Sequence, residues 1–338
     1  MLVLAQRQGR IHQRLAEELA EVQDRFARQL ISDLECVNEL VTHVERYRGK
    51  MLRPTLVLVT AMATDPASRL AVAESHRVVA TVFEMVHMAT LVHDDILDEA
   101  EMRRRGATIN HLAGNEAAVM LGDYLISHAY HLCSGLGRPT ISSAIAEATN
   151  TVCEGELLQL ANRNNWALDE ATYFEIIRRK TASLCGICCR VAASLNDASP
   201  AAEAACHDYG EKLGIAFQIV DDLLDLTGDE QAVGKTLGRD LEKGKLTLPV
   251  IRFLTEAQAP ARDEALALLA SGNGCGGPVD AAELLRDRLL ATGAVDTARR
   301  RAAELVDEAK AGLLAHLPDT PARSLMLDMA DAVLTRRF

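Results

Sequence analysis

The spacing of apolar residues predicts helices along almost the whole chain. In residues 75–98, SHRVVATVFEMVHMATLVHDDILD, apolar positions are nearly continuous, which is typical of a helix buried on most sides. Glycine and proline clusters separate such segments at TDPAS, SGLGRPT, NDASP, SGNGCGGP and HLPDTP, and no alternating strand pattern of any length lies between them. The pattern therefore predicts an all-α fold.

The chain shows no internal repeat at a solenoid period and no low-complexity linker. We therefore expect one helical domain over residues 1–338. Residues 227–245, TGDEQAVGKTLGRDLEKGK, form the longest segment without a helical pattern. Its lysines lie among glycines, which is typical of a mobile loop that closes over an anionic ligand.

Composition and charge narrow the possible functions. With 49% hydrophobic and 25% charged residues, the 338-residue chain has the composition of a soluble globular protein. Its net charge of -12 argues against general attraction to nucleic acid or to an acidic membrane, so an anionic partner needs a local cluster of bases. No run approaches the roughly 18 apolar residues of a membrane span, and the N-terminal apolar patch is too short for a signal peptide. We expect a cytoplasmic protein.

Eight cysteines raise the question of a metal or disulfide site. Cys185, Cys188 and Cys189 are clustered, but the other cysteines are scattered and supply no second close pair to complete a zinc site. In a cytosolic chain, packing as small apolar side chains is the favoured interpretation.

Two aspartate triplets with the same spacing are the most specific feature of the sequence. LVHDDILDEAEMRRR contains Asp94, Asp95 and Asp98, and FQIVDDLLDLTGD contains Asp221, Asp222 and Asp225. Each triplet follows an apolar helical run and is itself followed by basic residues. Carboxylates four residues apart on a helix repel each other mildly, a pattern that a solvated surface helix could also carry. Two such triplets at the ends of apolar helical runs favour burial instead, and a metal ion or a cationic partner is the usual way to offset the cost of buried carboxylates.

The types of ligand indicate which metal would bind. Carboxylates without accompanying His or Cys favour a hard cation, and Mg²⁺ takes one or two protein carboxylates together with phosphate oxygens. The arginines at 103–105 would supply further contacts to phosphate. Two acidic helix ends facing each other and rimmed by bases would make a cage for a diphosphate.

The sequence resembles a known family, the trans-polyprenyl diphosphate synthases, over nearly its full length. The matching motifs stand in the family's order: GKMLRP (residues 49–54), LVHDDILDEAEMRRRG (91–106), GD (122–123), EGELLQL (154–160), KTA (180–182), FQIVDDLLD (217–225) and GKTLGRDLEKGKLTLP (234–249). The chain is most similar to the long-chain bacterial branch, the octaprenyl type, because two residues separate the aspartates of the first motif. The resemblance implies an all-α, isoprenoid-synthase-type bundle around a central cavity, with two facing aspartate-rich helix ends.

The resemblance also implies a role for each matched residue. Asp94 and Asp98 would bind two Mg²⁺ ions, and Asp221, with Asp222 and Asp225, would bind a third. The other residues around the allylic diphosphate would be Asp95, Arg103, Lys180, Thr181, Gln218 and Lys235, and Lys245 would help to close the site. Isopentenyl diphosphate would be bound by Lys50, Arg53, His87 and Arg104.

The match has one departure and leaves some residues without a motif. Arg105 takes a position where the family usually has glycine, and Gly106 follows it. The motif can therefore be aligned in two registers, and the roles of Arg103 and Arg104 depend on which one applies. His93, Trp166 and Tyr173 match no functional motif and are interpreted as structural or packing residues.

The implied reaction begins with ionisation of the allylic C–O bond, assisted by metal ions and bases that neutralise the departing diphosphate. Isopentenyl diphosphate then attacks and loses a proton, which gives an allylic diphosphate five carbons longer. A terpene cyclase is an alternative, but it steadies its cations with aromatic residues, and this chain is only 4% aromatic. A non-catalytic subunit of a heteromeric synthase is a second alternative. Such subunits typically lose one of the two aspartate motifs, whereas this chain has both.

Product length is expected to depend on the helix that precedes the first triplet. The residues four, five, eight and eleven positions before Asp94 would line or floor a product tunnel, and they are Thr90, Ala89, Val86 and Phe83. The first two are small where short-chain relatives carry aromatic residues, and one helical turn spans about one isoprene unit, so a product of about thirty carbons or more is favoured. A C15–C25 product is the alternative. We also expect a homodimer without a membrane span, although a long product could bring it to a membrane surface.

Overall fold

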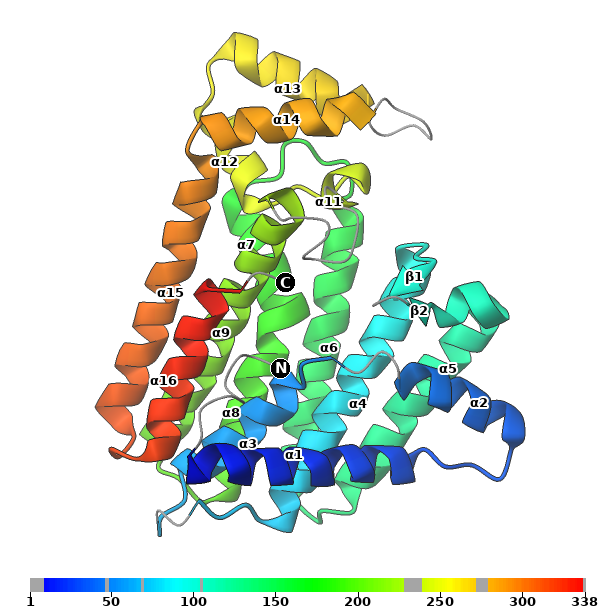
Figure 1. Cartoon of the computed structure of the whole chain (residues 1–338), viewed down its shortest axis with the longest axis vertical. Coiled ribbons are helices and arrows are strands. Elements are labelled where there is room, and N and C mark those ends of the chain that lie inside the picture. The colour runs from blue at the N-terminus through cyan, green and yellow to red at the C-terminus, as the bar shows by residue number, and fades with distance from the viewer. Residues whose placement is uncertain are drawn as a thin grey trace. The chain divides into compact units, whose positions relative to one another are not determined.

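The protein is described by a computed structural model that covers residues 9–45, 49–67, 70–103, 106–227, 239–271 and 279–336, without the side chains of residues 45, 239, 242, 271 and 279–283. These residues are almost entirely helical, which confirms the predicted all-α fold (Figure 1). They group into two compact units. The first comprises Met1–Thr149, Leu184–Gly210 and Lys310–Met329, and the second comprises Asn150–Ser183, Glu211–Ala309 and Ala330–Phe338. The expectation of a single domain stays a prediction.

The first unit is built around one long buried helix. Its helices are α1 (Arg10–Gln29), α2 (Glu35–Glu45), α3 (Leu52–Ala63), α4 (Glu74–Leu97), α5 (Ile109–Ser134), α8 (Ser183–Leu195) and parts of α6 (Pro139–Ala161), α9 (Pro200–Thr227), α15 (Ala294–His316) and α16 (Pro321–Leu334). Helix α4 packs against α1, α3 and α5, and α1 lies across α3 and α4 in Figure 1. Because α4 is enclosed by these neighbours, its sequence is apolar on most sides, as its pattern predicted.

Fully buried side chains on α4 form the centre of this core, among them Phe83, Met85, Val86 and Met88. Burial of each such side chain stabilises the fold by about 1.5–3 kcal/mol. Among the cysteines of this unit, the side chains of Cys133, Cys185, Cys188, Cys189 and Cys206 are buried. Burial raises the pKa of Cys206 to about 12, which keeps its thiol protonated and fits the predicted packing role.

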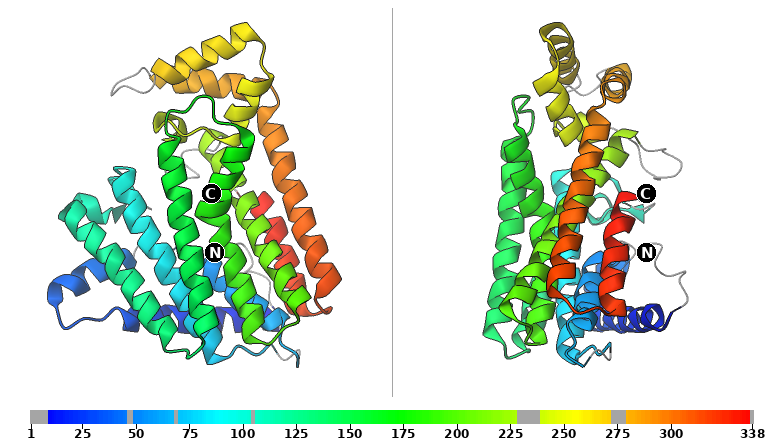
Figure 2. Two further views of the ribbon diagram at one scale, coloured as in Figure 1. Left: turned by 180° about the vertical axis from the view of Figure 1, so that it is seen from behind. Right: turned by 90° about the vertical axis from the view of Figure 1, so that its left-hand side faces the viewer.

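The second unit contains the remaining parts of α6, α9, α15 and α16, together with α7 (Glu170–Ile177), the π-helix η2 (Arg178–Ala182), α11 (Arg239–Glu242), α12 (Leu248–Glu256), α13 (Ala259–Ser271) and α14 (Val279–Ala291). Helix α12 contacts α7, α13 and α14, and the α13–α14 pair is seen from two further sides in Figure 2. The guanidinium of Arg252 on α12 donates a 2.7 Å hydrogen bond to Glu170 at the start of α7. This contact fixes α7, which precedes the π-helix.

Two details differ from the sequence pattern. Strands β1 (Met102–Arg103) and β2 (Gly106–Ala107) pair antiparallel, and with two residues each they are too short to show an alternating pattern. Within the segment 227–245, which was expected to be a loop, residues 239–242 form α11 and residues 228–238 lie outside the described residues. None of the described helices combines the length and the apolar character needed to cross a membrane.

Candidate active site

The first aspartate triplet lies at the C-terminal end of α4. Asp98 is the residue that ends the helix, and the chain then turns at Glu99, which has a left-handed φ of 46°. The backbone N–H of Glu99 donates to Ile96 (3.1 Å) and that of Ala100 donates to Asp95 (2.9 Å), which is the Schellman arrangement of a helix terminus. Because the C-terminal end of a helix carries partial negative charge, carboxylates placed there need a cation nearby.

For the middle aspartate of this triplet, the cation is an arginine of the chain itself. The side chain of Asp95 is 2% exposed, and Arg103 on β1 donates to both of its carboxylate oxygens, at 2.9 Å and 3.0 Å from Nε and at 2.8 Å from Nη2. Asp94 and Asp98, in contrast, are only partly buried. The triplet therefore divides into an internally paired carboxylate and two that are accessible to a ligand, and the diphosphate contact expected of Arg103 stays a prediction.

The residues expected to bind isopentenyl diphosphate also lie in the first unit. Lys50, Arg53 and His87 are all half-buried. Between the first two, Met51 is 7% exposed and adopts a left-handed φ of 52°, a conformation that non-glycine residues rarely adopt and that often marks functional segments. Arg104 lies outside the described residues, as does Arg105.

The expected product-length residues all lie on α4. Phe83, Val86 and Ala89 are completely buried, and Thr90 is half-buried with its hydroxyl donating to the carbonyl of His87 (2.8 Å). Their role in a tunnel stays a prediction.

The second triplet lies in the last two turns of α9, in the second unit. Asp221 is 39% exposed, whereas Asp222 and Asp225 are buried. Asp225 accepts a 3.2 Å hydrogen bond from the backbone N–H of Asp240 at the start of α11. Lys235, which was expected to contact the allylic diphosphate, lies outside the described residues. Asp221 is thus the member of the triplet most accessible to a ligand.

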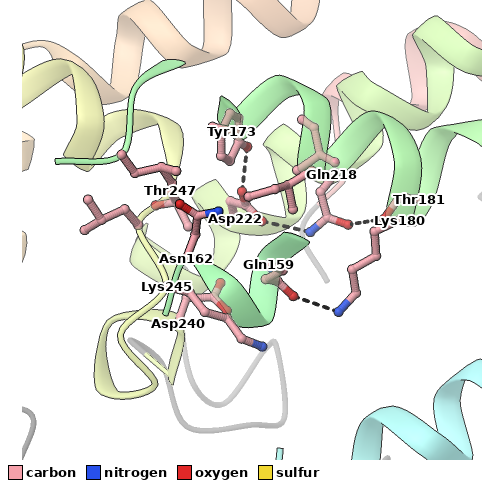
Figure 3. A pocket seen from close by; sticks show the side chains of 14 residues that line it. Gln159, Asn162, Tyr173, Lys180, Thr181, Gln218, Asp222, Asp240, Lys245 and Thr247 are labelled. Atoms are coloured by element: carbon pink, nitrogen blue, oxygen red, sulfur yellow. Dashed lines mark hydrogen bonds between the residues drawn. The ribbon is translucent and has the colours of Figure 1, made fainter. Parts of the chain in front are cut away.

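A hydrogen-bonded network holds Asp222 in place (Figure 3). The hydroxyl of Tyr173 donates to Oδ2 of Asp222 at 2.6 Å, and Nε2 of Gln218 donates to Oδ1 at 2.8 Å. Thr181 in turn donates to Oε1 of Gln218 at 3.0 Å. Burial raises the pKa of Asp222 well above its usual range, the charge of Asp240 raises it further, and the two hydrogen bonds oppose these effects.

The π-helix η2 presents Lys180 to the same region. Single π-turns are frequent at functional sites, and this one contains the KTA motif. Nζ of Lys180 donates to Oε1 of Gln159 at 2.8 Å and forms an ion pair with Glu156, both on α6. A Cβ at Gly155 would lie 2.5 Å from the backbone nitrogen of Lys180, so the glycine of EGELLQL permits α6 to approach the π-turn.

These groups line a pocket of about 110 Å³ within the second unit. Its polar lining consists of Gln159, Asn162, Tyr173, Lys180, Thr181, Gln218, Asp222, Asp240, Lys245 and Thr247, which Figure 3 labels. Lys245, expected to help to close the site, therefore lines the same pocket as Asp222 and Lys180. A pocket that combines two lysines, two carboxylates and amide donors suits an anion bound together with a cation.

The structure thus brings Lys180, Thr181, Gln218, Asp222 and Lys245 together around one pocket of the second unit. In the first unit it pairs Asp95 with Arg103. Sequence reasoning missed Tyr173, Asp240, Glu156 and Gln159, although the last three lie in quoted motifs. For Tyr173 a signal existed, since it precedes Lys180 by seven residues and so shares its helical face.

The acidic side chains fit the metal that the sequence suggested. Among the described residues, no three His, Cys, Asp or Glu side chains converge on one point as a preformed metal site. Asp94, Asp98 and Asp221 are nevertheless accessible carboxylates, and Mg²⁺ typically takes only one or two of these, with phosphate oxygens and water completing its shell.

Comparisons with known proteins agree with these features. The sequence profile of the family described as polyprenyl synthetase matches residues 34–283. The chain is 34% identical over 327 residues to an octaprenyl diphosphate synthase of Escherichia coli (strain K12), covering 97% of this chain and 98% of that protein. It is 32% identical over 320 residues to heptaprenyl diphosphate synthase component 2 of Geobacillus stearothermophilus, covering 94% and 95% of the two chains. The crystal structure of a decaprenyl diphosphate synthase from Rhodobacter capsulatus superposes with a TM-score of 0.88 at 34% identity, covering 97% and 99%.

Proposed function

The chain belongs to the polyprenyl synthetase family, and we propose that it condenses an allylic diphosphate with isopentenyl diphosphate to make a longer all-trans polyprenyl diphosphate. The observation that carries the proposal is the pocket that Lys180, Gln218 and Asp222 line together, since all three were expected at the allylic diphosphate or its metal ions. This combination is poorly suited to nucleophilic or hydride chemistry but well suited to the departure of a diphosphate.

The residues contribute to this reaction by charge and position. Mg²⁺ bound at Asp94, Asp98 and the second triplet, three ions in all, would neutralise the leaving diphosphate. Lys180 donates hydrogen bonds to diphosphate oxygens, and its contacts with Glu156 and Gln159 hold its ammonium group in place beforehand.

At the other substrate, Lys50 and Arg53 bind the diphosphate of isopentenyl diphosphate. The buried pair of Asp95 and Arg103 fixes the turn after α4 and so orients Asp94 and Asp98. The proton lost after attack goes to the released diphosphate, so no protein nucleophile is required.

We propose a product of at least about thirty carbons. The octaprenyl, decaprenyl and heptaprenyl synthases similar to this chain support a long product. The small side chains of Ala89 and Thr90 on α4 also support a long product, because each added five-carbon unit needs a tunnel depth of about one helical turn.

We also propose that the chain acts as a homodimer in the cytoplasm. Helix α5 exposes Val119 (43%) and Met120 (65%) after its kink at Gly114 and Leu112 (56%) before it, and exposed apolar side chains of this kind are typical of an interface. The similarity to a heptaprenyl synthase component makes a second, different subunit the alternative partner. Sedimentation of the purified chain at micromolar concentration distinguishes the two assemblies. A homodimer forms from this chain alone, whereas a heteromeric synthase needs the second subunit.

The reaction is tested by incubating the full chain with farnesyl diphosphate, labelled isopentenyl diphosphate and Mg²⁺, followed by chromatography of the products. A synthase moves the label into longer, acid-labile products and stops when EDTA removes the metal. A terpene cyclase would give unlabelled hydrocarbons, and a non-catalytic subunit would give no product. Lys180→Ala should abolish most of the transfer, and Lys212→Ala, which removes a lysine paired with Glu308 in the same unit, serves as the matched control.

A further inference from the structure

Arg336 lies two residues beyond the end of α16 and belongs to the second unit. Its side chain is only 8% exposed. The guanidinium carbon lies 3.8 Å from the centre of the Phe217 ring, and Nη2 lies 3.5 Å from Oδ1 of Asp221. No motif assigns a role to this arginine, yet its charge is placed against the first aspartate of the second triplet.

The surroundings of Arg336 are costly for a charged side chain. Burial lowers the pKa of Arg336, and the neighbouring Asp221 opposes this effect. Nε and Nη1 are buried and have no hydrogen-bond acceptor among the residues that the structure describes. Such unsatisfied donors are rare in folded proteins, and each one calls for a physical explanation. The guanidinium is therefore held by the charge of Asp221 and by stacking on Phe217, rather than by full hydrogen bonding.

Phe217 and Asp221 are four residues apart on α9 and so lie on the same face of this helix. Arg336 contacts both at once, which places a positive charge beside a carboxylate at the negatively polarised end of α9. Asp221 remains 39% exposed, so the same carboxylate is open to a second cation from solution. A divalent ion that binds there meets the repulsion of the guanidinium.

We infer that Arg336 is the resident counter-ion of Asp221 and that it sets the divalent-cation concentration at which the second aspartate motif is filled. The inference rests on the proposed function, because it takes Asp221 as a metal ligand. Arg336 acts through Asp221 and is thus a positioning residue: it holds the carboxylate in place before the metal arrives and raises the metal concentration that binding requires.

The test measures binding of Mn²⁺, as a spectroscopic substitute for Mg²⁺, to the full chain without substrates by electron paramagnetic resonance of the free ion. The relevant component of binding is the one that Asp221→Asn removes. Arg336→Gln and Arg336→Met should both tighten this component roughly three- to tenfold, because they remove a positive charge near the ion. Arg336→Lys, which keeps the charge, should bind within about twofold of the unmodified chain.

A double-mutant cycle separates this effect from general loss of structure. In the Asp221→Asn background, Arg336→Gln should leave the remaining Mn²⁺ binding unchanged. Arg299→Gln, which removes an exposed arginine paired with Asp296 in the same unit, controls for net charge and should leave every component unchanged. Arg336→Met keeps an apolar stem against Phe217, so it remains informative if Arg336→Gln folds poorly.

The outcomes distinguish the inference from the function on which it rests. Unchanged or weaker Mn²⁺ binding in both Arg336→Gln and Arg336→Met would overturn the counter-ion role, while an effect of Asp221→Asn would keep the metal assignment. If Asp221→Asn itself left Mn²⁺ binding intact, the assignment of the second motif as a metal site would fail.

Discussion

The hydroxyl of Tyr173 on α7 donates a 2.6 Å hydrogen bond to Oδ2 of Asp222 on α9, and both side chains are buried. This contact ties the helix that precedes the π-turn to the helix that carries the second aspartate triplet. Gln218 donates a hydrogen bond to the other carboxylate oxygen, so the two bonds together fix the orientation of the Asp222 side chain. Tyr173, which matched no motif, is therefore part of the support of the site.

Tyr173→Phe should reduce stability and activity together. It removes the donor and leaves a buried carboxylate oxygen without this partner, which costs about 1–3 kcal/mol in the free energy of unfolding. The looser carboxylate should also raise the Mg²⁺ concentration needed for half-maximal rate. Urea unfolding and Mg²⁺ titration of prenyl transfer measure the two effects. Tyr124→Phe, which removes a long 3.3 Å hydrogen bond to Leu30, is the control, and an unchanged Mg²⁺ requirement in Tyr173→Phe would indicate a packing role alone.

Arg103→Ala should unfold more readily, because it leaves the buried carboxylate of Asp95 without its counter-charge. Breaking one partner of a buried ion pair costs about 3–5 kcal/mol, and the double variant Asp95→Asn/Arg103→Ala should recover part of this loss. Chemical denaturation of the two variants and of the unmodified chain provides the measurement. If Arg103→Ala kept its stability and only raised the Michaelis constant for the allylic substrate, Arg103 would act mainly on the diphosphate, as the sequence motif implied.

Gly155→Ala should disturb the π-turn that carries Lys180. The added Cβ would lie 2.5 Å from the backbone nitrogen of Lys180 and 2.7 Å from Cβ of Arg179, and no flexible side-chain end is available to yield. We expect a loss of about 1–3 kcal/mol in stability and a larger proportional loss in turnover. The matched control is Gly312→Ala in α15, where the nearest atom would be 3.9 Å away and alanine favours the helix. Equal behaviour of the two variants would contradict the close approach.

A pH dependence should arise from Glu175, whose pKa is lowered to about 2 by hydrogen bonds from Arg178 and then Arg179. Because the folded-state pKa lies below the ordinary value of 4.5, this contribution to stability is present above about pH 4.5 and is lost as the pH falls toward 2. Glu175 is 37% exposed, so solvent screening limits the contribution to about 1 kcal/mol or less. Thermal melting from pH 6 to pH 3 should show a smaller pH dependence in Glu175→Gln than in the unmodified chain. Parallel curves would contradict this origin.

The fold class and the two acidic helix ends could be predicted because both are local properties of the sequence. Apolar periodicity identified α4 and α9, and the aspartates stand where these helices end. The partners of those aspartates could not be predicted in the same way. Tyr173 and Arg336 reach their carboxylates only through tertiary folding, since they lie 49 and 115 residues from Asp222 and Asp221 in sequence. Helical spacing does not encode such distant contacts.

Product length should respond to the face of α4 that carries Ala89. Ala89→Tyr should shorten the products to about fifteen or twenty carbons, because the ring would fill a tunnel about one turn below the aspartates, and Phe83→Ala should lengthen them if Phe83 is the floor. Ala80→Tyr is the matched control, since Ala80 is equally buried but lies nine residues away, on the opposite face of the helix. Both tyrosine variants overpack a buried position and should lose about 1–3 kcal/mol of stability, so only the chain length separates them. Chromatography of dephosphorylated products measures it. The same product length in all three variants would mean that α4 does not line the tunnel, although the metal chemistry of its C-terminal aspartates would be unaffected.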